Sequence, residues 1–536
     1  MGIMTFSTRA ILLVGILLHA GAVAAQDTSA AAGETPPATT GQADPLPEMA
    51  EIEQAWRRGD FTTVRAGLKR LAEEAGTPLA QYRYGRVLFE GRGGPRDVEG
   101  AMAWLQKAVD QNQADAATLL ARILLSGESA GTTRDVPRAA ALLQRAATRG
   151  DAEAQYYLGL LLRTGQTGAP DPEGAFNWLL AAAEQDHLDA AYQLSQMYAR
   201  GEGTAADTAQ ALAWLTKAAE AGHMDAQYDL ANALASGQEV GQDLPAALGW
   251  YRRAAEAGQP LAQRSLGTYY MTGAEGIEPD GDEALRWLNL AAQAGDPGAM
   301  HNLGIGHLEG TVLAQDDALA AQWFARAAEE GLARSMTQLA GLKETGRGTE
   351  VDMAGAVTLY RTAVERGDPG AALRLARLTI EGRLDGMVAP QSAVPWVHYA
   401  MSQGEAGAED WLQARADEGM RAAQAALGLE LAGREGQQAE GVALLTKAAE
   451  AGEIVAQLAL GEAWARGEYG LTQDYVQAHA WLNMAAASGH AAAAERRDVV
   501  AQLMTPEQIA EAQAMTRRLF AAQTAPKADQ TVRTDR

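Results

Sequence analysis

The sequence contains no cysteine among its 536 residues. Disulfides and thiolate metal sites are therefore excluded, and stability must come from packing. Aromatic residues make up only 6% of the chain, and no sustained run alternates Val, Ile, Thr and aromatic residues, so a sheet-based core is not expected. Alanine is abundant and glycine recurs steadily. This composition favours many short helices separated by turns.

Basic residues and long apolar runs are also scarce. The chain has 44 basic and 68 acidic residues, with a net charge of −24, which disfavours nucleic acid and anionic lipid as partners. Arg9, the short apolar run over 10–18 and the small residues before Gln26 predict a secretory signal peptide over 1–25 rather than a transmembrane segment. The mature protein is expected in the periplasm or outside the cell.

One pattern returns through most of the sequence. A glycine, or a residue in the equivalent place, ends a helical stretch at intervals that are mostly 36 or 37 residues. In each of the last eleven repeats, Trp or Leu stands eight residues before the terminator and Ala stands four residues before it. Such agreement indicates tandem repetition. The predicted terminators are Gly76, Asn112, Gly150, Asp186, Gly222, Gly258, Gly295, Gly331, Gly367, Gly404, Gly452 and Gly489.

The front half of each repeat has its own pattern, as in "AEAQYYLGLLL" (152–162) and "AMHNLGIGHLEG" (299–310). A Leu is followed by Gly, Ala or Ser, which lets two helices approach closely. We expect a pair of antiparallel helices, with the Trp or Leu of the second helix filling the space opposite the small residue. Stacked pairs bury what one pair cannot, which predicts a solenoid.

The combined pattern A-x-x-x-L-G, then A-x-x-W-[LYF]-x-[KR]-A-A-x-x-G, resembles the Sel1-like repeat family, which is related to tetratricopeptide repeats. The resemblance implies an all-α, right-handed α/α superhelical solenoid of about eleven repeats with terminal capping helices. Residues 48–76 resemble a tetratricopeptide unit that caps the array. Residues 490–522 are expected to close it, with Thr505 as N-cap and Gln508 completing a capping box before the last helix.

One interval is longer than the others. Between Gly404 and Gly452 the stretch 405–419 adds one helix without a partner, so the repeats are expected over 77–404 and 420–489. This helix could be a hinge or a binding platform. The remaining segments, 26–47 and 523–536, are expected to be a disordered tether and a disordered tail.

The sequence contains no recognisable catalytic set, cofactor site or metal site. Ser129 satisfies a G-x-S-x-G string, but that motif needs a strand-to-helix turn, and a loop between helices is expected here. Some cysteine-rich relatives bind penicillin-type ligands, yet the chain has no Ser-x-x-Lys string. His187, His223 and His490 each open a repeat, and their spacing of one repeat or more favours turn residues over a metal row. Asp280 is expected to cap a helix rather than bind calcium.

The resemblance implies a non-enzymatic scaffold that binds a protein or peptide, such as a basic segment, on its concave face, in envelope signalling or cell-surface maintenance. The alternatives are a cell-wall or β-lactam-acting hydrolase built on the solenoid, and a structural spacer. By analogy with tetratricopeptide stacks, the fifth residue of each first helix faces inward, or packs between first helices. Nearby acids, Glu153, Asp189, Asp225 and Asp229, favour a basic partner. The resulting candidate row is Tyr156, Tyr192, Tyr228, Arg264 and His301.

Overall fold

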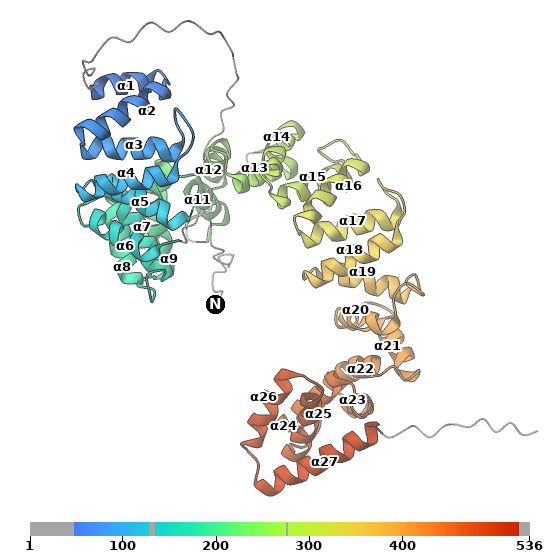
Figure 1. Cartoon of the computed structure of the whole chain (residues 1–536). Coiled ribbons are helices and arrows are strands. Elements are labelled where there is room, and N and C mark those ends of the chain that lie inside the picture. Colours follow the sequence, from blue (N-terminus) through green and yellow to red (C-terminus); the bar gives the residue numbers. More distant parts are fainter. Residues whose placement is uncertain (1–47, 128–133, 239, 275–276, 525–536) are drawn as a thin grey trace, which may run out of the picture. The chain divides into compact units, whose positions relative to one another are not determined.

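The computed structural model describes residues 48–127, 134–238, 240–274 and 277–524 (Figure 1). These residues form 27 α-helices and no β-strand, as the sequence predicts. The predicted signal peptide 1–25, the tether 26–47, Ser129 and residues 525–536 of the predicted tail lie outside the described residues. None of the described helices is both long enough and apolar enough to cross a membrane.

The helices form two compact units, which meet in the sequence between Gln263 and Arg264. The first unit opens with two short helices and a π-helical turn, and then contains five antiparallel pairs. In this and the following unit, we call the members of each pair the first and the second helix. The elements are α1 (Met49–Arg57), α2 (Phe61–Arg70), the π-helical turn (Leu71–Ala75), α3 (Pro78–Glu90), α4 (Val98–Asp110), α5 (Ala114–Ser126), α6 (Val136–Ala147), α7 (Ala152–Thr164), α8 (Pro172–Ala183), α9 (Leu188–Arg200), α10 (Thr208–Glu220), α11 (Met224–Ser236) and α12 (Leu244–Glu256).

The second unit continues the pairs and ends with two further helices. Its paired helices are α13 (Pro260–Thr272, which begins in the first unit), α14 (Gly281–Gln293), α15 (Pro297–Glu309), α16 (Asp317–Glu329), α17 (Ala333–Thr345), α18 (Met353–Glu365), α19 (Pro369–Ile380), α20 (Pro390–Ser402), α22 (Arg421–Gly433), α23 (Gln438–Glu450), α24 (Ile454–Arg466) and α25 (Tyr475–Ala487). The unpaired helices are α21 (Ala408–Asp417), α26 (Ala491–Ala501) and α27 (Pro506–Thr524). Helix α21 lies where the sequence predicts one extra helix and packs between α20 and α22.

The predicted terminators are all confirmed, because each of them has a positive φ. Asn112 (φ 68°) and Asp186 (φ 61°) adopt this conformation without being glycine. A basic side chain in the next second helix, or directly after it, contacts each of them: Arg149 donates to Asn112 Oδ1 at 2.9 Å, and Lys217 Nζ lies 2.9 Å from Asp186 Oδ1. The side chains that replace glycine thus join neighbouring repeats.

Second helices commonly begin at an aspartate that accepts a hydrogen bond from the first turn. The predicted cap Asp280 accepts from the backbone N–H groups of Asp282 and Glu283 at 3.0 and 3.1 Å. The predicted capping box at Thr505 is also present: the Gln508 N–H donates to Thr505 Oγ1, and Gln508 Oε1 accepts from the Thr505 N–H. These caps satisfy donors that the first turn leaves free.

The contact between the two helices of a pair differs from the sequence-based expectation. The residue that faces the small residue of the first helix is the one after the Trp, not the Trp. A Cβ built on Gly159 would lie 2.7 Å from Leu179 Cγ, and one on Gly304 would lie 2.6 Å from the ring of Phe324. Both Leu179 and Phe324 are fully buried. The expectation was wrong by one position, because the helix turns about 100° per residue and points the Trp to the edge of the contact.

Most of the tryptophans are therefore half-buried at the edge of the core. A Lys or Arg three residues later covers the exposed face of several rings, as Lys107 does over Trp104, with Nζ 3.6 Å from the ring centroid. Arg253 lies over Trp250 in the same way. Such cation–π contacts stabilise a ring that packing covers only in part.

A buried glutamine links each of several first helices to the second helix before it. Gln155 and Gln227 donate through Nε2 to the carbonyl oxygens of Ala147 and Ala219, at 3.2 and 3.0 Å. These carbonyls belong to a helix C-terminus, where no intrahelical donor remains. The glutamine therefore satisfies a helix end and fixes how successive pairs stack. The same bond is made by Gln263, Gln424 and Gln457.

Candidate binding surface

The five candidate residues occupy the fifth position of α7, α9, α11, α13 and α15. Tyr156, Tyr192 and Tyr228 belong to the first unit, and Arg264 and His301 belong to the second. The three tyrosines and Arg264 are half-buried, whereas His301 is buried. The tyrosine rings are thus partly open to solvent, whereas His301 offers little surface to a partner.

The tyrosine rings pack against the residue that opens the next repeat. Tyr156 stacks on His187 with ring centroids 4.6 Å apart, and Tyr192 lies 4.5 Å from the ring of His223. Both histidines cap their helices: Nδ1 accepts from the backbone N–H of Ala190 in one case and of Ala226 in the other. These histidines are the predicted turn residues, and they hold the tyrosine rings in place.

Two separate polar contacts flank the packed rings of Tyr192 and His223. The Tyr192 hydroxyl donates to Asp229 Oδ2 at 2.7 Å. Because Nδ1 of His223 is an acceptor, Nε2 carries the proton and faces Asp189 Oδ1 at 3.2 Å. That hydrogen bond holds the pKa of Asp189 below its usual value, whereas burial raises the pKa of Asp229.

The carboxylates beside the tyrosines remain largely open. Glu153, Asp189 and Asp225 are exposed in the first turns of α7, α9 and α11, and Asp229 is half-buried. Glu153 Oε1 lies 2.8 Å from Arg122, and Asp225 accepts a hydrogen bond from Gln259 at 3.3 Å. Their positions in the first turn also suit the helix dipole. The surface around the tyrosines is therefore negative and accessible.

The two members of the row in the second unit have strong internal partners. Arg264 Nη1 contacts both carboxylate oxygens of Asp296, at 2.8 and 3.1 Å, and Asp296 caps α15. His301 Nδ1 lies 2.8 Å from Ser335 Oγ of the next repeat. Burial lowers the pKa of His301 to about 4, so its ring is neutral at pH 7. Both side chains link repeats, the alternative role that the sequence left open.

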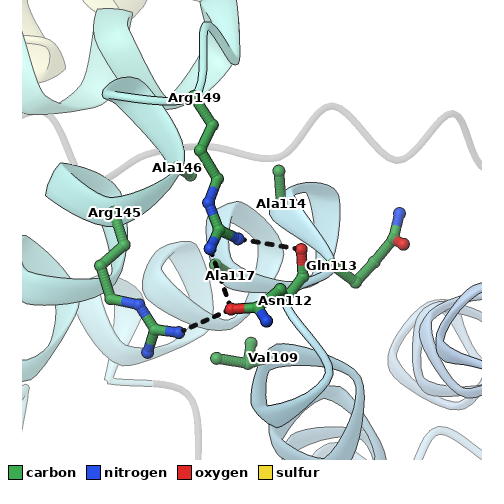
Figure 2. Close-up of a pocket in the computed structure, with 8 residues that line it drawn as sticks. All are labelled: Val109, Asn112, Gln113, Ala114, Ala117, Arg145, Ala146 and Arg149. Carbon is green, nitrogen blue, oxygen red and sulfur yellow. Dashed lines mark hydrogen bonds between the residues drawn. The ribbon is translucent and has the colours of Figure 1, made fainter.

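A small hollow between α4, α5 and α6 gathers two arginines near the N-terminus of α5 (Figure 2). Arg145 and Arg149 both donate to Asn112, Arg149 through bonds of 3.0 and 2.9 Å. The guanidinium groups are thus engaged with the terminator of the preceding pair. These contacts help to hold Asn112 where a glycine ends most other helix pairs. The arginines that line the hollow are used within the fold, so we do not assign a ligand to it.

Two contacts that hold this surface in place were not predicted from the sequence. One is the buried glutamine, which a recurring Ala-Gln before the Leu of the first helix, as in "AEAQYYLG" (152–159), could have indicated. The other is the stacking of His187 and His223 on the tyrosines. Only the recurrence of His directly after a terminator hinted at it, since a ring contact between repeats leaves no local pattern.

Comparison with known protein families identifies the repeats. The Sel1 repeat family model matches ten segments of the chain, which together cover more than half of it. Helices α19, α20 and α21 fall between the eighth and ninth matches. The matched residues are 78–113, 114–151, 152–187, 188–223, 225–259, 260–296, 297–332, 333–368, 421–453 and 454–490.

Similar solved structures include two bacterial proteins. A protective antigen of uropathogenic Escherichia coli strains, c5321, displays an SLR fold and is 26% identical, with a TM-score of 0.54 over 87% of this chain and 99% of that one. A Sel1 repeat protein from Oxalobacter formigenes is 29% identical and covers 46% of this chain and 100% of its own, with a TM-score of 0.43.

Proposed function

This chain belongs to the Sel1 repeat family, and we propose that it is a non-enzymatic scaffold that binds a protein partner through the first helices of its first unit. The fold is one typically used for protein–protein interaction, and the family is generally non-enzymatic. The proposal narrows the candidate row to Tyr156, Tyr192 and Tyr228 with the carboxylates beside them.

The observation that carries this proposal is a set of rigid, half-exposed aromatic rings surrounded by open carboxylates. Tyrosine contributes strongly at protein interfaces because it offers a large contact area and loses little entropy when it is already held in place. Here His187 and His223 hold two of the rings before any partner arrives. The partner should therefore bind without reorganising the surface.

The charge of the surface selects the kind of partner. Glu153, Asp189 and Asp225 are exposed on three successive first helices. A partner segment carrying Lys or Arg at matching intervals would be attracted to them, and salt would weaken the attraction. We therefore propose a basic segment of a protein or peptide as the ligand.

The proposed place of action is the bacterial envelope. It depends on the signal-peptide pattern over residues 1–25 and not on the described helices. Cell fractionation, followed by mass spectrometry of the mature N-terminus, tests this part. We expect an exported chain that begins after residue 24 or 25; a cytoplasmic chain that retains residues 1–25 would contradict it.

Affinity capture from envelope extracts tests the binding surface. We expect Tyr228→Ala combined with Asp225→Lys to lose the proteins that the wild type captures, because the pair removes one ring and reverses one charge. Glu256→Lys is the matched control: it makes the same charge change at an exposed position of α12, in the same repeat. Equal capture by all three proteins would reject this surface.

A further inference from the structure

The last helix, α27, does not follow the alternation of first and second helices. Helix α26 packs on α25 as the first helix of another repeat would, whereas α27 lies against α25 and reaches α23 (Figure 1). The Thr516 hydroxyl approaches the Ala480 carbonyl oxygen at 3.4 Å, and Gln523 Nε2 donates to the Ala449 carbonyl oxygen at 3.0 Å. Helix α27 thus crosses two second helices.

The part of α25 that α27 covers is exposed to solvent in the second helices of other repeats. Ala480 is 0% exposed, whereas Ala213 and Gly249, at the same position of α10 and α12, are exposed. Met484, one turn further, is 2% exposed and stands where α10 and α12 carry the exposed Lys217 and Arg253. In α25, Ala480 and Met484 therefore form an apolar stripe, whereas α10 and α12 carry a small residue and a cation at these positions.

Helix α27 has one less exposed face, and Thr516 beside that face is the residue that reaches Ala480. Gln508, Ala512, Met515, Leu519 and Gln523 follow one another at intervals of three or four residues, which places them on the same side of a helix. Of the nineteen residues of α27, only Ala512 is buried. A helix held by so few buried side chains belongs to the part of a structure that opens without global unfolding.

We propose that the stripe of Ala480 and Met484, together with the C-terminal end of α23, is a second binding site, which takes an amphipathic helix of a partner protein and is filled by α27 in the free chain. The partner helix needs the pattern that α27 shows. A small hydroxyl residue lies at Ala480 as Thr516 does, a leucine stands one turn further as Leu519 does, and the opposite face is polar. This is helix-in-groove recognition, in which a few spaced apolar residues supply the contact.

Because α27 is covalently attached next to this site, a partner helix has to compete with α27 for it. A segment attached through residues 502–505 acts at an effective concentration in the range of ~1 mM. A free helix with the same contacts therefore binds weakly to the intact chain and much more tightly once α27 is undocked. The site lies in the second unit and includes no residue of the tyrosine surface.

Binding of a labelled synthetic peptide of residues 505–524 to full-length protein tests the proposal. In the variant Ala512→Glu with Leu519→Glu, α27 should leave its site, and we expect the peptide to bind at least about tenfold more tightly than to the wild type. The control, Gln513→Glu with Phe520→Glu, makes the same charge change on exposed residues of α27 and should behave as the wild type. Adding Ala480→Arg to the undocked variant should abolish binding. Equal affinity for all variants, or no binding to the undocked one, would overturn the proposal.

Thiol labelling gives a second test that leaves α27 unchanged. The chain has no cysteine, so Ala480→Cys introduces a single reactive group. We expect it to react more slowly than Ala213→Cys, which is exposed, and much faster than Ala363→Cys, which is fully buried in α18. Labelling as slow as that of Ala363→Cys would show that α27 opens only with global unfolding, and would overturn the proposal.

Discussion

The glutamines that join successive pairs allow a stabilising substitution to be designed. Gln81 and Gln155 each have their Oε1 satisfied by a second glutamine, Gln111 and Gln185, whose Nε2 lies 2.8 Å away. Each donor directly precedes a helix terminator. Gln227 Oε1, in contrast, is buried without a donor.

The residue in the donor's place for Gln227 is Ala257, which is exposed and directly precedes Gly258. We expect Ala257→Gln to supply the missing N–H. A buried acceptor that gains a partner stabilises by about 1–3 kcal/mol, and ordering a glutamine side chain costs about 1.5–2 kcal/mol. The predicted net gain is therefore small, at most about 1 kcal/mol.

Hydrogen exchange of the amides in α11 and α12 measures this gain locally, which matters because long repeat arrays need not unfold in one step. Ala257→Glu is the control, since it keeps the length and shape of glutamine but places an acceptor where the donor is needed. The reasoning predicts that Ala257→Gln is protected more than the wild type and Ala257→Glu is not. It is refuted if the two variants behave alike.

Further predictions concern a buried carboxylate, a buried imidazole and a cap. Glu344 is almost fully buried and accepts from Arg374, Arg383 and Tyr360, so Glu344→Gln should cost about 2–3 kcal/mol in urea unfolding, and Arg383→Met less; equal costs would contradict this. The pKa of His301 is lowered to about 4 by burial, so folding stability should fall as the pH drops from about 6.5 towards 4, because only the unfolded chain takes up the proton. Substituting His301→Asn should flatten that part of the stability profile, and an unchanged profile would contradict it. Asp280→Ala should cost about 1 kcal/mol through loss of its cap and Asp282→Ala should cost clearly less, measured by thermal unfolding.

The helix terminators could be predicted because each depends on residues close in sequence. A helix terminator needs a positive φ, which glycine supplies and which Asn112 also adopts. The identity of the residue that faces Gly159 was missed, although it lies next to the predicted one, because spacing alone does not set how a helix is rotated against its partner. Leu179, not Trp178, fills that place.

Contacts between repeats could be predicted least. The fifth position of the first helices was chosen by analogy, and the structure shows that its side chains reach the next repeat: Tyr192 contacts Asp229, and Arg264 contacts Asp296. Each pair is more than thirty residues apart, so no local pattern reports it. The docking of α27 across α25 and α23 is a contact of the same kind.

Photo-crosslinking tests the central claim most directly, namely that the first helices of the first unit bind a protein. A photoreactive amino acid is placed at Asp225 on α11 and, in a second protein, at Glu256 on α12 of the same repeat. Both positions are exposed, and both variants are irradiated in cells. The proposal predicts a defined crosslinked protein from position 225 that weakens with added salt in extracts, and none from position 256. Crosslinks of the same proteins from both positions, or from 256 alone, would contradict it.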